Sequence, residues 1–175
     1  MPVRYKSYLR LLLQICEENK FFSTSDDLDY WFDGYELKEG LSDELQIREA
    51  ISWAFENDKM SDFLLEYWED TFFHSDLCLS IMHGSISHNN CQLDMHYSLY
   101  RIATKNKYYY KVECSGYLAE DLWNENGFFG EIEDLIDQKK IINEFKDKCR
   151  FISTNFDEFD DEVMEDNDIC VSFYK

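Results

Sequence analysis

The stretch YSLYRIATKNKYYYKVECS, residues 97–115, decides the fold class of this chain. From Tyr108 to Cys114, Tyr and Val alternate with Lys111 and Glu113, the pattern of a β-strand with one wetter face. Just before it, residues 104–107 read TKNK, which suits a tight turn between two strands. The stretch therefore predicts a β-hairpin.

Towards the N-terminus the sequence changes to helical spacing. Residues 3–19 carry apolar side chains at intervals of three and four, as an amphipathic helix does. Ser25 and Ser42 precede two further helical segments, and a serine at such a position accepts the free backbone N–H groups of a first turn. Ser61 and Asp62 open a third segment. The side chains expected to be buried in these three segments include Ile47, Ala50, Ile51, Ala54, Phe55, Leu64, Leu65, Trp68 and Phe72.

Towards the C-terminus, strands and one helix are expected. Short apolar alternations over residues 77–87 and 93–103 predict two strands, and an apolar stripe over residues 128–148 predicts a helix. Residues 151–154 and 169–174 read as two short strands. The fold class is α+β: N-terminal helices, a small antiparallel β-sheet with a hairpin near 97–115, a C-terminal helix near 128–148 and a closing strand. We expect a single compact acidic domain over residues 1–175.

The charge of the chain limits its partners. It contains 37 Asp and Glu against 17 Lys and Arg, a formal net charge of −20. Residues 21–100 alone hold 17 acids and three cations. Such a surface repels nucleic acid and anionic lipid and attracts basic proteins. We therefore expect a basic protein partner, a nuclease or another nucleic-acid-binding protein, with no direct contact to nucleic acid or membrane.

Other features of the composition lead us to expect a cytoplasmic protein. The chain has no apolar run of membrane-spanning length, and its N-terminal leucines are not followed by a signal-peptide cleavage site. The six cysteines are dispersed and lack CxxC spacing, so we expect buried free thiols in a reducing compartment. No motif indicates a cofactor.

An acidic run near the C-terminus combines charge with apolar side chains. Eight of the twelve residues 157–168 are acidic, and Phe159, Val163 and Met164 lie among them. Charge steers a partner and apolar anchors hold it, so the run is a candidate docking surface. A solvated loop is the simpler interpretation. The partner-binding candidates here are Asp157, Glu158, Phe159, Asp160, Asp161 and Glu162.

Two further segments mix acids with aromatic rings. Residues 26–33 read DDLDYWFD, and residues 66–70 read EYWED. Trp31 and Trp68 suit a core better than an interface, whereas the carboxylates between them should be exposed. The partner-binding candidates here are Asp26, Asp27, Asp29, Glu66, Glu69 and Asp70.

All four histidines and two cysteines fall within 23 residues. They are His74, Cys78, His83, His88, Cys91 and His96. Imidazole and thiolate are zinc ligands, and a thiol beside a histidine can act as a nucleophile. The spacings match no zinc finger and no HExxH motif, so polar turn residues are the simpler interpretation and no metal is predicted.

A small basic group lies across the hairpin. Arg101, Lys105, Lys107 and Lys111 flank three consecutive tyrosines. Basic side chains with aromatic rings can bind single-stranded nucleic acid. The net charge argues against this, and favours a charged strand edge that discourages aggregation.

These observations favour an acidic stoichiometric inhibitor of a basic nucleic-acid-processing protein. Two settings share this physics: an immunity protein for a nuclease toxin, and a phage- or plasmid-type anti-restriction or anti-CRISPR inhibitor that imitates DNA charge. The abundant aromatic residues favour specific protein recognition over DNA mimicry. The alternatives are a small cytoplasmic enzyme or metal-binding protein that uses the His74–His96 cluster, and a regulatory protein-docking module.

Overall fold

The computed structural model describes residues 2–88, 94–116, 118–125, 132–135, 137–154 and 169–175. Helices and a five-stranded antiparallel sheet account for most of them, so the predicted α+β class is confirmed. The chain divides into two compact units. Unit 1 consists of Met1–Cys78 and Ile102–Tyr109, and unit 2 consists of Leu79–Arg101 and Tyr110–Lys175. That the whole chain forms one domain stays a prediction.

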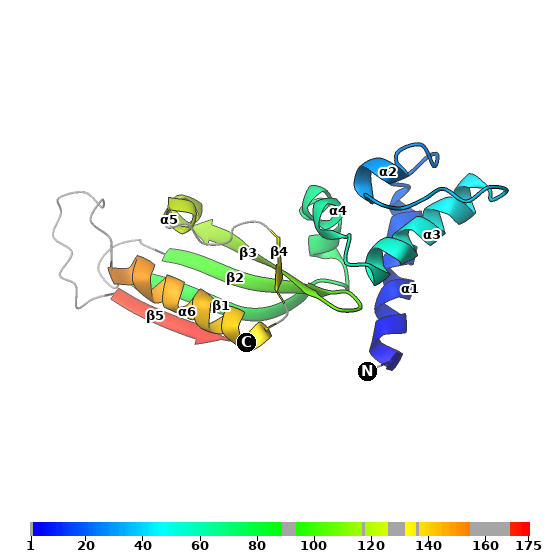
Figure 1. Ribbon diagram of the computed structural model, residues 1–175. Helices are drawn as coiled ribbons and strands as arrows, with labels where there is room; N and C mark the ends of the chain where they lie inside the picture. The colour runs from blue at the N-terminus through cyan, green and yellow to red at the C-terminus, as the bar shows by residue number, and fades with distance from the viewer. Residues whose placement is uncertain (1, 89–93, 117, 126–131, 136, 155–168) are drawn as a thin grey trace. The chain divides into compact units, whose positions relative to one another are not determined.

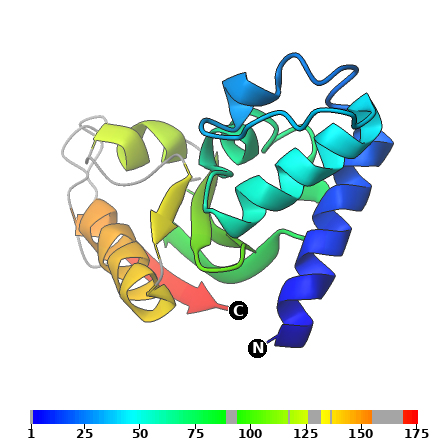
Figure 2. The same cartoon turned by 45° about the vertical axis from the view of Figure 1, so that its right-hand side comes forward.

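Unit 1 is built from helices. They are α1 (Pro2–Asn19), α2 (Leu28–Trp31), α3 (Asp43–Glu56), α4 (Ser61–Glu66) and the 3-10 helix η1 (Phe72–His74). The long helices α1 and α3 lie against each other (Figure 2), with the rings of Tyr5 and Phe55 5.3 Å apart. Ser42 caps α3 as predicted, since its hydroxyl oxygen accepts the backbone N–H of Leu45 at 3.4 Å.

Two predictions for unit 1 are wrong. Ser25 does not cap the second helix, which begins at Leu28; the Ser25 hydroxyl instead donates to the Asp43 carboxylate at 2.7 Å. Leu65 is 38% exposed rather than buried. Because α4 ends at Glu66, it is too short to hold one apolar stripe from Leu64 to Phe72.

The tip of the hairpin also belongs to unit 1. The backbone N–H of Thr104 donates to the carbonyl of Lys107 at 2.9 Å, which closes the predicted turn. Asp58 accepts hydrogen bonds from the Thr104 hydroxyl at 3.4 Å and from the Asn106 amide at 3.3 Å. These bonds hold the turn on the end of α3.

Unit 2 contains most of the sheet. Its elements are β1 (Leu79–His88), β2 (Asp94–Ala103), β3 (Tyr108–Gly116), α5 (Ala119–Glu125), β4 (Glu133–Leu135), α6 (Gln138–Thr154) and β5 (Ile169–Tyr174). The strand order is β4-β3-β2-β1-β5, and β1 pairs antiparallel with both β2 and β5. The last two residues of β2 and the first two of β3 are those assigned to unit 1.

Helix α6 covers one face of β1 and β5, as Figure 1 shows. Gly84 of β1 allows this approach, because a Cβ atom at that position would lie 3.0 Å from the sulfur of Cys149 and 3.3 Å from the ring of Phe173. The residues beside Gly84 on β1 point to the other face. That face carries polar side chains, among them His83, Ser85, His96 and Ser98.

Two predictions for unit 2 are wrong. Residues 151–154 are not a strand but the last turn of α6, because the buried spacing of Ile141, Phe145 and Cys149 continues to Ile152. The helix begins at Gln138, since the Asp137 carboxylate accepts the backbone N–H of Lys139 at 3.0 Å. Part of the expected 128–148 stripe lies outside the described residues.

Strand β3 lacks the predicted wetter face over its first half. Tyr109 and Tyr110 are both fully buried, and Lys111 is only 9% exposed. The strand lies inside the sheet, between β4 and β2. An interior strand that is covered on both faces does not show polar alternation.

Candidate docking surface

Two acidic segments that lie far apart in the sequence meet in unit 1 through their aromatic rings. Trp31, at the end of α2, and Tyr67, the residue after α4, have ring centroids 5.7 Å apart at an interplanar angle of 50°. The exposed ring of Tyr30 stands edge-on against Trp31 at 5.0 Å. These three side chains form a row of aromatic rings across both segments.

A buried phenylalanine supports this row. Phe63 of α4 is fully buried, and its ring lies 5.7 Å from Trp31 and 5.0 Å from Tyr67. Leu28 and Phe32 are also fully buried and point inward from the first segment. Core packing on both sides therefore fixes the positions of the rings.

The six predicted carboxylates of these segments are exposed. They are Asp26, Asp27, Asp29, Glu66, Glu69 and Asp70. We call these six acids together with Tyr30, Trp31 and Tyr67 the acidic-aromatic face. Tyr30 is 78% exposed, so its ring is accessible to a partner. Trp68 is fully buried, as expected for a core residue.

Acidic residues from both segments raise the pKa of one tyrosine, Tyr67. Burial raises the pKa of Tyr67, and the carboxylates of Glu66 and Asp27 raise that pKa further. One of these acids comes from each segment. Their fields therefore overlap at the centre of the acidic-aromatic face, where a cation from a partner would be stabilised.

The other sequence candidates are placed differently. Asp157, Glu158, Phe159, Asp160, Asp161 and Glu162 lie outside the described residues, as does Cys91. Within the described ranges, no three His, Cys, Asp or Glu side chains form a group that could hold a metal ion. His96 pairs with Asp94 at 3.0 Å, and His83 is hydrogen-bonded to Ser80 and Ser98.

Three of the cysteine thiols are not activated as nucleophiles. Burial raises the pKa of Cys16, Cys114 and Cys149 to about 12, so these thiols stay protonated at neutral pH. Cys16 and Cys149 are buried as predicted, whereas Cys170 is exposed on the edge strand β5.

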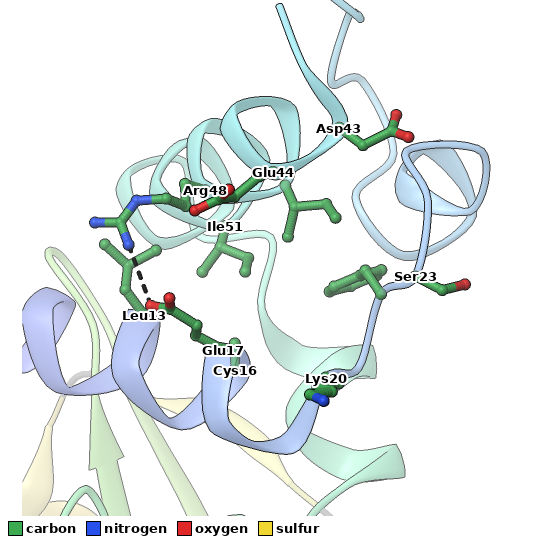
Figure 3. A pocket seen from close by; sticks show the side chains of 11 residues that line it. Leu13, Cys16, Glu17, Lys20, Ser23, Asp43, Glu44, Arg48 and Ile51 are labelled. Carbon is green, nitrogen blue, oxygen red and sulfur yellow. Dashed lines mark hydrogen bonds and ion pairs between the residues drawn. The ribbon is translucent and has the colours of Figure 1, made fainter.

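A groove of unit 1 lies between α1 and α3 (Figure 3). Its volume of about 210 Å³ is below the roughly 300–1,000 Å³ of typical small-molecule sites. The carboxylate of Glu17 and the guanidinium of Arg48 bridge it at 3.4 Å. A larger and more open hollow of about 390 Å³ is also lined by Glu17 and Arg48, together with Lys6 and Arg10.

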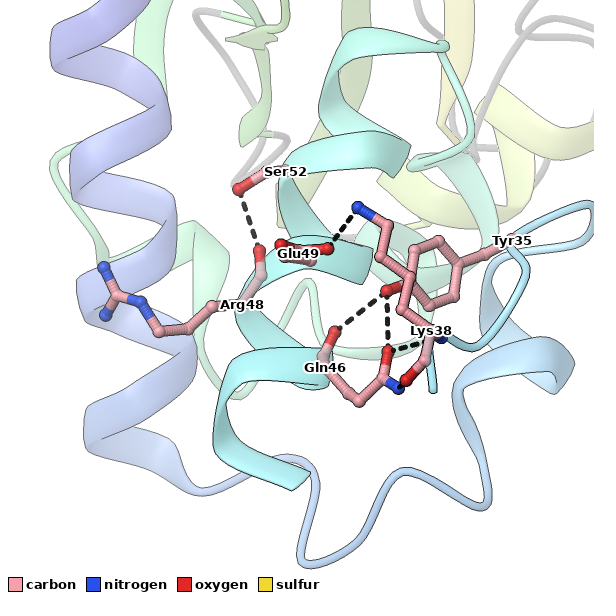
Figure 4. A network of polar contacts seen from close by, with 6 residues as sticks. All are labelled: Tyr35, Lys38, Gln46, Arg48, Glu49 and Ser52. Atoms are coloured by element: carbon pink, nitrogen blue, oxygen red, sulfur yellow. Dashed lines mark hydrogen bonds and ion pairs between the residues drawn. The ribbon is translucent and has the colours of Figure 1, made fainter. Parts of the chain in front are cut away.

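A polar network fixes the chain between α2 and α3 (Figure 4). The side-chain oxygen of buried Gln46 accepts hydrogen bonds from the Tyr35 hydroxyl and from the Lys38 backbone N–H, both at 3.1 Å. Its amide nitrogen donates to the Lys38 carbonyl. Lys38 also forms an ion pair with Glu49. This network is structural, since its central amide is buried and its bonds stay within the unit.

No protein-family model, curated protein or solved structure matches this chain. No helix among the described residues is both long and apolar enough to cross a bilayer.

Proposed function

We propose that this protein is a stoichiometric inhibitor that binds and blocks a basic nucleic-acid-processing protein through its acidic-aromatic face. The contact between Trp31 and Tyr67 carries the proposal, because it joins two acidic segments into one surface with rings at its centre. Either segment alone would be an ordinary solvated stretch.

The combination of groups suits a basic groove. Lys and Arg side chains that bind phosphates in a nuclease would meet exposed carboxylates here, and unlike charges speed association by steering. Arg also stacks on aromatic rings, which gives exposed Tyr30 a specific role beside Trp31. Aromatic side chains are among the residues that contribute most of the binding energy at protein interfaces.

The acidic run at residues 157–162 stays a second candidate contact of the same kind. Immunity to a nuclease toxin and inhibition of a restriction or CRISPR nuclease both fit this mechanism. A regulatory module that docks on a basic partner without blocking it is the alternative, and the activity of the partner under saturating inhibitor separates the two.

A paired capture experiment tests the proposal. The surface variant reverses Asp27, Glu66 and Asp70 to Lys. The control variant reverses Glu120, Asp121 and Glu125, which are exposed acids of α5 in unit 2. Both variants change the net charge equally. A specific partner is retained by the wild type and the control but lost with the surface variant.

The same experiment can overturn the proposal. Equal retention by all three proteins, or equal loss in both variants, would mean that net charge alone draws basic proteins to this chain. A specific partner that is identified in this way is then assayed for nuclease activity against increasing inhibitor.

A further inference from the structure

A second feature, in unit 2, suggests chemistry of a different kind. The imidazole of His83 lies between two hydroxyl groups: its Nε2 is 2.7 Å from the Ser80 oxygen, and its Nδ1 is 2.8 Å from the Ser98 oxygen. We propose that Ser80 and His83 form a nucleophile–base pair that accepts acyl groups from activated esters, with Ser98 as a positioning residue.

The register of the sheet explains how these side chains meet. Ser98 is opposite His83 and Tyr100 is opposite Ser80, so each pair shares one face of the sheet. Residues three apart on a regular strand point to opposite faces. Ser80 and His83 share a face only because a register shift between Ser80 and Met82 inserts one extra residue. Such bulges re-aim side chains and are common beside active sites.

The neighbouring strand holds the imidazole in place. Tyr174 of β5 is the register partner of His83, and the two rings stack with centroids 5.1 Å apart and planes 22° apart. Figure 1 shows β5, β1 and β2 side by side. His83 is therefore held by Ser98 on one side and by Tyr174 on the other, while Ser80 is exposed.

These distances satisfy the geometry of an activated serine. In the tautomer with a proton on Nδ1, His83 donates to the Ser98 oxygen, and Nε2 accepts the proton of the Ser80 hydroxyl. This is the arrangement of nucleophile, base and orienting group that activates a serine in unrelated enzymes.

The reaction follows from these roles. The Ser80 oxygen forms a bond to the ester carbonyl carbon, and its proton moves to Nε2 of His83. The bond from that carbon to the leaving oxygen breaks, the alkoxide or phenolate departs, and the imidazolium of His83 releases its proton to solvent water. Neutral His83 then takes a proton from the water that attacks the acyl-serine. The bond from the carbonyl carbon to the Ser80 oxygen breaks, and His83 returns that proton to Ser80 as the acid leaves.

The substrate class is an ester with a good leaving group. A nucleophile–base pair activates the attacking oxygen but does not stabilise the oxyanion, and the loss of one oxyanion donor costs about 10²–10³ in rate. Aryl esters tolerate this loss better than amides because their leaving group needs no protonation.

The test uses the full chain and 4-nitrophenyl acetate. We expect a burst of nitrophenolate and an acetyl group on Ser80, located by peptide mass spectrometry. Ser80→Ala should abolish that acetylation, and His83→Gln should slow it by about 10²-fold or more. Ser85→Ala, on the same strand and face, should behave as the wild type.

Ser98 is tested by loss and rescue of the rate. Ser98→Ala should slow acylation of Ser80, and Ser98→Thr, which keeps the hydroxyl, should restore it, while thermal unfolding of both stays near that of Ser85→Ala. The proposal is overturned if the burst persists in Ser80→Ala, or if acetyl groups appear only on lysines. It does not depend on the inhibitor function, since the two sites are in different units.

Discussion

The ammonium nitrogen of Lys148 lies 5.0 Å from the centre of the Trp123 ring, and both residues are fully buried in unit 2. Burial lowers the pKa of Lys148 from its usual 10.5 to about 8. Cys114 of β3 and Cys149 of α6 are the titratable neighbours that act on it. A buried cation whose pKa is lowered in this way reduces the free energy of unfolding at neutral pH.

We predict that Lys148→Met stabilises the protein at about pH 7 by about 1–3 kcal/mol. The upper limit follows from the lowered pKa, because one pKa unit corresponds to about 1.4 kcal/mol, and loss of the cation–π contact reduces the gain. Between about pH 8 and the usual 10.5, only the unfolded chain keeps this proton. The burial cost in the wild type therefore falls as the pH rises, and the advantage of the variant shrinks.

Urea unfolding of both proteins at about pH 7 and about pH 9.5 checks this prediction. The difference between them isolates Lys148, because all other titrating groups are shared. Lys139→Met, at an exposed position on the same helix, is the control and should change little at either pH. A stability difference that is constant across this range would contradict the account.

Replacement of Gln46 should weaken unit 1. Gln46→Leu leaves the backbone N–H and carbonyl of Lys38 without their side-chain partner, and the Tyr35 hydroxyl keeps only its bond to the residue 46 carbonyl at 3.4 Å. We expect a loss of about 2–3 kcal/mol in the free energy of unfolding, since unmade hydrogen bonds of buried groups are costly. Ser52→Ala removes a hydroxyl that donates to the Arg48 carbonyl on α3, and it should cost under about 1 kcal/mol. Equal effects of the two variants would rule out the network as the cause.

The packing of α6 on the sheet can be tested at Gly84. Gly84→Ala places a methyl group 3.0 Å from the Cys149 sulfur, and we expect a cost of about 1–3 kcal/mol from overpacking. In a Cys149→Ala background the same change should cost less, because the blocking sulfur is absent. A double-mutant cycle measures this coupling. Zero coupling would mean that the backbone moves away instead.

Local chemistry explains which parts of the fold could be predicted. The TKNK turn at residues 104–107 and the Ser42 cap depend on neighbours in the sequence, and both are confirmed. The strand predicted over residues 151–154 is wrong because β-branched and aromatic residues also occur in the last turn of a helix. Only its spacing from Phe145 and Cys149 reveals the helix.

The candidate sites depend on contacts that the sequence does not display. Trp31 meets Tyr67 through tertiary packing over Phe63, although each acidic segment was recognisable by itself. The exposure of Tyr30 is only weakly indicated by the sequence. Leu28 and Phe32, two residues away on either side, are apolar and point inward, which leaves Tyr30 on the outer side. Ser80 and His83 share a face of the sheet only because of a β-bulge, and no residue pattern in the sequence predicts that bulge.

Tyr30→Ala is expected to weaken partner binding without changing the fold. The ring is 78% exposed and contacts Trp31 at its edge, so the free energy of unfolding should fall by less than about 1 kcal/mol. As an interface anchor the same ring should contribute about 2 kcal/mol or more to binding. Calorimetric titration beside urea unfolding separates the two effects. Unchanged affinity would remove Tyr30 from the docking surface.

Titration of the partner's nuclease activity separates inhibition from docking without inhibition. The partner isolated with the wild type is assayed against increasing amounts of wild type, of the Asp27, Glu66 and Asp70 charge-reversal variant and of its α5-region control. We expect nuclease activity to fall to zero near equimolar wild type or control, and the surface variant to need a large excess. Full nuclease activity with saturating wild type bound, or equal inhibition by all three proteins, would contradict the proposed inhibition.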